Sequence, residues 1–266
     1  MSLQIDEQKC TGCGLCTTVC LRQCLRVEAG HVAAREELCF SCGHCVAVCP
    51  ADAVAIPEYR MDLVEELNGM EMDPDQLQLF MSGRRSIRQY RKQRVEQEKL
   101  EKIIETGRMS PTGSNLQNVR FVVVQDQLSD IRKQAVDVLA RNADDIVRET
   151  GLSVYGERFL QMQKDLAAGV DSLFYDAPAL VVVLERGRSV VNGALAASRM
   201  ELMAAALGLG ACYNGFFVFA AERDPDLREK LGYTQKECIA TTFTVGYPAI
   251  AYQRTAPRKA AQVKWM

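Results

Sequence analysis

The sequence predicts an α+β protein in which a small cysteine-rich head precedes a larger body, a mixed sheet enclosed by helices. Two observations predict this division. Nine of the 11 cysteines lie before residue 50, and the rest of the 266-residue chain alternates strand-like and helical patterns of apolar residues. Apolar residues make up 48% of the chain, which is ordinary for a globular protein. We expect a head over residues 1–57, an acidic linker over 58–73 and a body over 74–266.

The charge balance and the apolar stretches exclude several classes of protein. The 32 basic and 34 acidic residues leave a net charge of −2, so we expect no nucleic-acid partner. The longest apolar stretch, Leu202 to Ala211, is too short to span a membrane. The amino terminus has no basic segment followed by an apolar core, so no secretory signal is visible. We therefore expect a cytoplasmic protein whose clustered cysteines bind metal rather than form disulfides.

The spacing of the cysteines indicates which metal is bound. Two runs share the pattern C-x2-C-x2-C-x3-C, and Pro50 follows the second. Three thiolates at this spacing can hold one face of a four-iron cluster, while the x3 step carries the fourth sulfur toward a neighbouring cluster. The first run is Cys10, Cys13, Cys16 and Cys20, and the second is Cys39, Cys42, Cys45 and Cys49.

Because of this doubled spacing, the first 57 residues resemble the two-cluster bacterial ferredoxins. A structural zinc site is the alternative, but zinc needs four ligands and leaves further cysteines of the two runs without a role. The resemblance implies two [4Fe-4S] clusters, one on Cys10, Cys13, Cys16 and Cys49 and the other on Cys39, Cys42, Cys45 and Cys20.

Other residues of the head have simpler interpretations. Leu21 departs from the pattern, because it stands where the second run has Pro50. Cys24 is expected to be a small buried side chain, and His44 is expected to face solvent. A short hairpin is expected, because residues 25–27 and 31–33 flank an Ala-Gly turn.

The linker and the first helix of the body follow. The linker carries several carboxylates against Arg60 and is expected to be irregular, with one short helix at most. Asp73 as N-cap and Pro74 in the first turn then begin a helix. Leu77, Phe80 and Met81 are expected to form its apolar face.

The remaining body is expected to alternate helices and strands. No G-x-G-x-x-G follows a strand, which argues against a Rossmann domain. The long apolar helix is expected in the core or at a subunit interface. In chain order we expect a helix over 100–107, a buried strand over 121–124, a helical region over 128–168 interrupted at Gly151 and Gly156, a strand over 180–184, the long helix over 192–209 and a strand over 239–245.

Three segments of the body suit the binding of an anionic or polar ligand. The arginines of GRRSIRQY, residues 83–90, repel one another unless they are solvated or bound to an anion. The polar loop in SPTGSNLQNVRFVVV, residues 110–124, suits hydrogen bonds to a polyol or a ring edge. The tail carries GYP at 246–248 and APRK at 256–259. Each segment alone also fits a solvated surface or a plain turn.

Taken together, these segments resemble the nitroreductase family of flavoproteins over residues 74–266. The resemblance rests on five motifs in family order, and it implies FMN bound between the two subunits of an obligate homodimer. The motifs are an Arg-x-Ser-x-Arg helix, a Ser-Pro-x-x-x-Asn-x-Gln loop, the strand DAPALVVV, the segment GLGACYNGF and a GYP…PRK tail.

The resemblance also implies which residues contact FMN. Guanidinium forks suit a phosphate, and a fixed cation near the flavin N1–C2=O edge, here Arg88, raises the flavin potential. The phosphate and ribityl contacts match Arg84, Ser86, Arg258 and Lys259, with Arg85 beside them, and Arg254 is an alternative to Arg258. The loop that covers the partner's flavin matches Pro111, Thr112, Gly113, Ser114 and Asn115, and the backbone N–H groups facing N5 and O4 match those of Asn214 and Gly215.

The sequence departs from the family in one place. Some relatives carry a second lysine near N1, where this chain has Leu173-Phe174-Tyr175. The family resemblance therefore predicts the cofactor of this chain better than it predicts the class of substrate.

The function expected from both resemblances is an FMN- and iron–sulfur-dependent oxidoreductase. The head would accept single electrons from reduced ferredoxin or a similar donor, and the flavin would deliver pairs to a nitroaromatic or quinone-like acceptor. One alternative is an electron-transfer protein whose partner is another redox protein. Another is a flavin-destroying or dehalogenating variant of the same fold.

Overall fold

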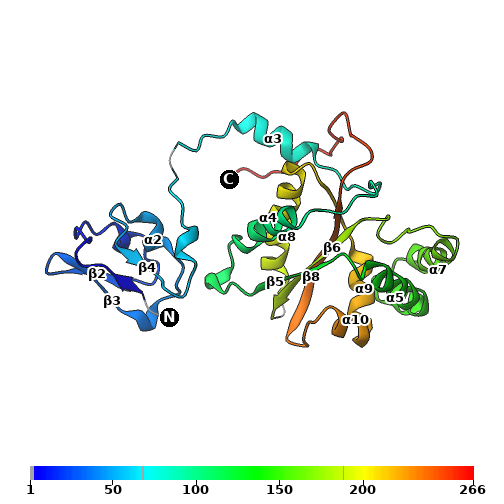
Figure 1. The fold of residues 1–266 in the computed structure, drawn as a ribbon, viewed down its shortest axis with the longest axis horizontal. Coiled ribbons are helices and arrows are strands. Elements are labelled where there is room, and N and C mark those ends of the chain that lie inside the picture. Colours follow the sequence, from blue (N-terminus) through cyan, green and yellow to red (C-terminus); the bar gives the residue numbers. More distant parts are fainter. Residues whose placement is uncertain (1–2, 68, 188) are drawn as a thin grey trace. The chain divides into compact units, whose positions relative to one another are not determined.

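The computed structural model describes residues 3–67, 69–187 and 189–266, which form two compact units (Figure 1). The amino-terminal unit runs to Glu71 and also includes Thr112–Leu116. The second unit consists of Met72–Pro111 and Gln117–Met266. The acidic segment expected as a linker therefore groups with the head as far as Glu71, and the predicted boundaries did not include Thr112–Leu116.

The amino-terminal unit is a small fold around a core that contains cysteines. Strands β2 (Leu25–Glu28) and β3 (His31–Ala34) form an antiparallel hairpin, which confirms the predicted one. The core contains Cys16 and Cys45 together with aliphatic side chains such as Ile56. The other elements are β1 (Gln4–Ile5), which pairs with β4 (Val54–Ala55), α1 (Leu15–Thr18), α2 (His44–Val48), and the 3-10 turns η1 (Glu36–Leu38) and η2 (Met61–Leu63).

The second unit is built on a four-stranded sheet in the order β5-β6-β8-β7. These strands are β5 (Val119–Val124), β6 (Ala179–Arg186), β8 (Glu237–Gly246) and β7 (Gly210–Tyr213), and paired neighbours run antiparallel. A bridge between Ser86 and Ala211 adds a parallel contact beside β7. The predicted strands over 180–184 and 239–245 are confirmed as the two central strands.

Helices cover both faces of this sheet (Figure 1). Alternate residues of β6 explain why, because Leu180 and Val182 pack in one apolar core while Val181 and Val183 pack in the other. The core containing Val181 is completed by α4 (Gln97–Arg108) and α8 (Val191–Ala206). The opposite core is completed by α5 (Leu128–Arg141), α6 (Ala143–Thr150), α7 (Val154–Ala167), α9 (Gly215–Arg223) and α10 (Pro225–Lys230).

Several local predictions are confirmed. Asp73 is the N-cap of α3 (Pro74–Gly83), and its carboxylate accepts a 2.9 Å hydrogen bond from the Gln76 N–H. The long helix expected over 192–209 is α8, which ends at Ala206, shortly before Gly208 at φ 74°. Among the described residues, no helix is both long and apolar enough to cross a membrane.

Two predictions need correction. The strand over 121–124 exists, but β5 is an edge strand and only Val124 within it is buried, because one side has no neighbouring strand. The helical region breaks at Asn142 and Gly151, not at Gly156, which lies inside α7. A Cβ at Gly156 would lie 3.3 Å from Val147, so this glycine allows α7 to pack closely against α6. Strand β7 and helices α9 and α10 were not predicted.

Candidate functional site

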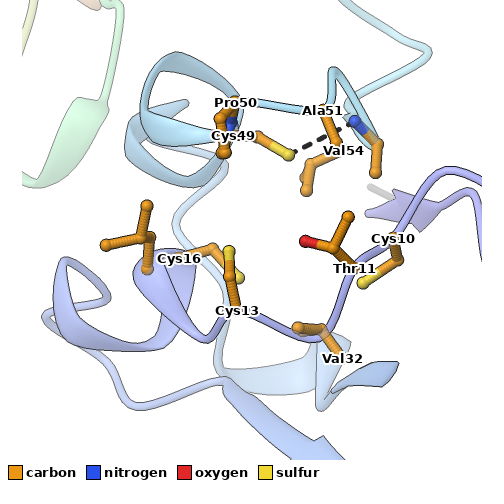
Figure 2. Close-up of a pocket in the computed structure, with 11 residues that line it drawn as sticks. Cys10, Thr11, Cys13, Cys16, Val32, Cys49, Pro50, Ala51 and Val54 are labelled. Carbon is orange, nitrogen blue, oxygen red and sulfur yellow. Dashed lines mark hydrogen bonds between the residues drawn. The ribbon is translucent and has the colours of Figure 1, made fainter. Parts of the chain in front are cut away.

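Four cysteines, drawn from both runs, meet at one pocket in the amino-terminal unit. Cys10, Cys13 and Cys16 of the first run line it together with Cys49 of the second (Figure 2). This is the set of four that the ferredoxin resemblance assigned to one cluster. All 11 cysteines are free thiols, and the residues around the four include Thr11, Val32, Pro50 and Val54.

Backbone N–H groups point at sulfur in both runs. The Cys24 N–H donates to Cys20 Sγ at 3.2 Å, and the Ser41 N–H donates to Cys39 Sγ at 3.2 Å. The Ala53 N–H donates to Cys49 Sγ at 3.3 Å. Such hydrogen bonds stabilise thiolate charge and are one means of setting a cluster potential. The side chain of Cys24 is buried, as expected, and its backbone N–H is the group that contacts the Cys20 sulfur.

Exposed His44 lies at the second run. The imidazole is exposed to solvent, as expected. Its Nδ1 lies 3.2 Å from the Sγ of Cys42, which is a predicted cluster ligand. Among the described residues, no three His, Cys, Asp or Glu side chains are grouped closely enough to hold a single metal ion.

Burial keeps some of these thiols protonated. It raises the pKa of Cys45 to about 11, with Cys39 and Cys42 adding to the effect. Burial also raises the pKa of Cys16, where the nearby Cys49, Cys10 and Cys13 act in the same direction. Cationic iron would offset this cost, because a metal binds the thiolate form.

A second pocket, here called the arginine pocket, has a volume of about 460 Å³ and lies in the body at the end of the sheet. It is lined by half-buried Arg84 and Arg85, by Arg91 and by Glu201 of α8. The Arg-x-Ser-x-Arg motif is an extended segment and not the helix expected, because α3 ends at Gly83. The Ile87 N–H donates to the Ala211 carbonyl at 2.9 Å, and Arg91 Nε donates to the Pro248 carbonyl at 3.0 Å. The pocket has the size of a cofactor site and the positive charge that a phosphate requires.

Arg88 points to a different partner from the neighbouring arginines. Its guanidinium lies 5.8 Å from the centre of the Tyr175 ring. Burial alone would lower the pKa of Arg88, but Cys212 and Tyr175 raise it, so the side chain stays charged. Arg88 is therefore a cation held beside Tyr175, and its position near the flavin stays a prediction from the family resemblance.

Tyr175 is held in place by a buried carboxylate. Asp171 accepts hydrogen bonds from the N–H groups of Leu173, Phe174 and Asp176, at 2.8 to 3.1 Å. It also forms a 2.8 Å ion pair with Arg132. Tyr175 lies within this turn at φ 60°, a conformation that a non-glycine residue keeps only where its surroundings impose it.

The backbone N–H of Asn214, predicted to face the flavin, is engaged within the sheet. That N–H donates to the Thr242 carbonyl at 2.8 Å, because the chain continues the pairing of β7 with β8. The Asn214 side chain caps α9 by accepting from the Phe217 N–H at 3.0 Å. Gly215 begins α9, where N–H groups lack acceptors inside the helix.

The remaining predicted residues lie elsewhere. Arg258 and Lys259 are exposed in the tail beyond β8 and do not line the arginine pocket. Thr112, Gly113, Ser114 and Asn115 fold with the amino-terminal unit, although Pro111 belongs to the body. Ser86 forms the bridge to Ala211.

Sequence reasoning missed Glu201. Its side chain is almost wholly buried and accepts a 2.8 Å hydrogen bond from Arg84. The signal was present, because Glu201 is the one carboxylate within a largely apolar helix. Such a residue is expected to have a charged partner.

Comparison with known families defines the class of protein. Residues 9–53 match the model of the 4Fe-4S dicluster domain, so the chain carries an iron–sulfur domain of the ferredoxin type. Residues 81–247, more than half of the chain, match the model of the nitroreductase family. The chain belongs to the nitroreductase family and is an oxidoreductase. Both expected resemblances are thereby confirmed at the level of the family.

Solved structures share the fold of the body. A nitroreductase with bound FMN from Bacteroides fragilis is 22% identical, with a TM-score of 0.58, over 73% of this chain and 100% of that one. A nitroreductase with bound FMN from Desulfitobacterium hafniense is 20% identical, with a TM-score of 0.56 over the same shares. A BluB-like flavoprotein from Clostridium difficile is 21% identical, with a TM-score of 0.54, over 74% and 100%. No curated protein matches the chain.

Proposed function

We propose that the chain is an FMN-dependent oxidoreductase that takes electrons through two four-iron clusters and delivers them to an oxidised small molecule. Nitroaromatics and quinones are the proposed acceptors, and reduced ferredoxin or a similar protein is the proposed donor. Flavin suits the junction when bound, because it exchanges electrons singly or in pairs, whereas a cluster exchanges only single electrons.

The grouping of Cys49 with Cys10, Cys13 and Cys16 is the observation that carries this proposal. Four cysteines from two sequence runs around one pocket are what a shared, two-cluster arrangement requires, and this supports the proposal. Cys20, Cys39, Cys42 and Cys45 are the proposed ligands of the second cluster.

The arginine pocket is the proposed phosphate end of the FMN site. Arg84 and Arg85 offer charge-assisted hydrogen bonds to a phosphate, and Ser86 lies beside them. Arg88 is the proposed cation near the flavin ring, and the Gly215 N–H is the proposed donor to it. The bound FMN reported for two solved structures of this fold supports the assignment.

Assembly as a homodimer is also proposed. Helix α3 exposes Leu77, Leu79, Phe80 and Met81, and α8 exposes Val191 and Leu195. A contiguous apolar patch exposed on a globular unit is typical of a surface that another chain covers, and four neighbouring side chains of α3 are the proposed patch. The loop Pro111–Asn115 is proposed to cover the partner's flavin, so dimerisation and FMN binding would be linked.

Anaerobic purification followed by cofactor analysis and an acceptor screen tests the proposal. We expect about eight irons and one FMN per chain, together with turnover of a nitroaromatic or quinone. Stoichiometric zinc without iron would contradict the clusters, and loss of flavin from the folded dimer would contradict the FMN site. Cofactor reduction without turnover of any acceptor would favour an electron-transfer protein instead.

A further inference from the structure

The segment Thr112–Leu116 folds with the amino-terminal unit, although the residues on both sides of it belong to the body. The side chain of Asn115 connects this segment to the turn at Phe40 and Ser41. Its Nδ2 donates to the Ser41 carbonyl at 2.8 Å and to the Phe40 carbonyl at 3.3 Å. It also lies 3.4 Å from the hydroxyl of Tyr59. A single amide group therefore contacts a turn that lies about 75 residues earlier in the chain.

That turn is part of the second cysteine run. Ser41 stands between Cys39 and Cys42, is buried, and has a φ of 50°. Its N–H donates to Cys39 Sγ at 3.2 Å, while its carbonyl accepts from Asn115. The same peptide region therefore links the Asn115 amide to a proposed cluster ligand.

The segment itself has a backbone that needs support. Ser114 and Asn115 have φ values of 50° and 53°, in the region where glycine is usual. A 3-10 turn holds them, since the Asn115 N–H donates to the Thr112 carbonyl at 3.1 Å. Non-glycine residues keep this conformation where several contacts impose it, and the Asn115 side chain supplies such contacts.

We propose that Asn115 is a latch that couples the order of Thr112–Leu116 to the integrity of the Cys39–Cys42 turn. The inference rests on the proposed function, in which this turn binds a cluster and this segment covers the flavin. A cluster that fixes the turn then also orders the segment. Because such coupling is reciprocal, loss of the Asn115 hydrogen bonds loosens the turn. Asn115 is thus a positioning residue for the Cys39–Cys42 turn.

Hydrogen exchange of the iron-loaded, FMN-saturated protein tests the latch. In Asn115→Ala, amide exchange at Phe40 to Cys42 and at Thr112 to Leu116 should be about tenfold faster, since donors to two carbonyls are lost. The rest of the head should exchange as in the wild type. Iron release to a chelator should also become faster, for about half of the iron. Asn115→Asp keeps the shape but has no N–H donor, and it should behave in the same way.

Leu116→Ala is the matched control, because its side chain is exposed in the same segment. It should leave exchange at Phe40 to Cys42 unchanged. Equal exchange in the wild type and both Asn115 variants would overturn the latch while leaving the proposed cofactors in place. A wild-type protein that holds neither iron nor FMN would instead overturn the proposed function, so the two failures are distinguishable.

Discussion

Arg84 donates a 2.8 Å hydrogen bond to Glu201, and the carboxylate of this ion pair is buried while the guanidinium lines the arginine pocket. Burial raises the pKa of Glu201, and Arg84 opposes that rise. The carboxylate therefore holds the arginine and also places a negative charge beside the proposed phosphate site.

Replacing Glu201 with glutamine should tighten FMN binding several-fold. Glutamine still offers an oxygen to Arg84, but the repulsion between a carboxylate and a phosphate is removed. The gain should shrink at low pH, where the wild-type Glu201 is itself protonated because its pKa is raised. Flavin fluorescence titration measures the affinity. Glu222→Gln is the control, because burial raises the pKa of Glu222 as well but Glu222 does not line the pocket. Weaker binding in Glu201→Gln would mean that Glu201 acts mainly by holding Arg84.

Removing the arginine itself should have the opposite effect. Arg84→Ala deletes a charge-assisted contact to the phosphate, which is worth about 1.5–3 kcal/mol, so FMN affinity should fall by roughly ten- to a hundredfold. The exposed Arg141→Ala on α5 is the control for loss of one positive charge. Unchanged affinity in Arg84→Ala would move the phosphate site to another group of cations.

Gly12→Ala should disrupt the first cysteine run. A Cβ at Gly12 would lie 2.1 Å from the Gly30 carbonyl oxygen, and this backbone atom cannot move aside without displacing the hairpin turn. Gly43→Ala is the matched control, because Gly43 has a similar positive φ but nothing within 4 Å of its Cβ position. Iron per chain should fall further in Gly12→Ala than in Gly43→Ala. Equal iron contents would show that backbone strain alone, without the clash, governs loading.

Features that depend on local sequence patterns were predicted better than contacts between residues far apart in the chain. The cysteine spacing predicted the head because cluster ligands from one run must lie within a few residues of one another. The alternation of β6 side chains between the two apolar cores follows in the same way from the period of a strand. The predicted helix break at Gly156 was wrong, because a glycine inside a helical pattern indicates either a break or close packing.

The contacts that complete the sites join residues far apart in the sequence. Arg84 and Glu201 are separated by 117 positions, and Asn115 and Ser41 by 74. No local pattern selects such partners, because the fold brings them together. Arg258 and Lys259 are exposed and do not line the arginine pocket, so their contacts with FMN stay a prediction from the family resemblance.

Acid should weaken the body through Glu237. Its hydrogen bond with Arg120 holds the pKa of Glu237 at about 2, below the usual 4.5. A carboxyl with a lowered folded pKa adds stability above about pH 4.5, and this is lost as pH falls toward 2. Glu237→Gln should therefore lower the unfolding free energy by about 1–2 kcal/mol at pH 7, discounted because Arg120 is half exposed, and by almost nothing near pH 2. Urea unfolding at both pH values measures the difference, and an equal loss at both would assign the effect to packing.

Cys45→Ala tests whether electrons reach the flavin through the head. Cys45 is a proposed ligand of the second cluster and is buried in the core of the amino-terminal unit, so its loss should damage that cluster. FMN content should be largely unchanged, because none of the proposed FMN residues is altered. Reduction of the flavin by reduced ferredoxin should slow sharply, whereas reduction by dithionite, a small molecule that can enter the flavin pocket, should continue.

The reduction rates of Cys45→Ala and the wild type can be compared once the variant has the FMN content and the dimer mass of the wild type. Cys238→Ala is the control, because Cys238 lies in β8 of the body, outside both proposed sites, and it should change neither rate. A Cys45→Ala variant with an intact body that accepts electrons from ferredoxin at the wild-type rate would place that cluster off the electron path. The head would then be a structural appendage or serve another partner.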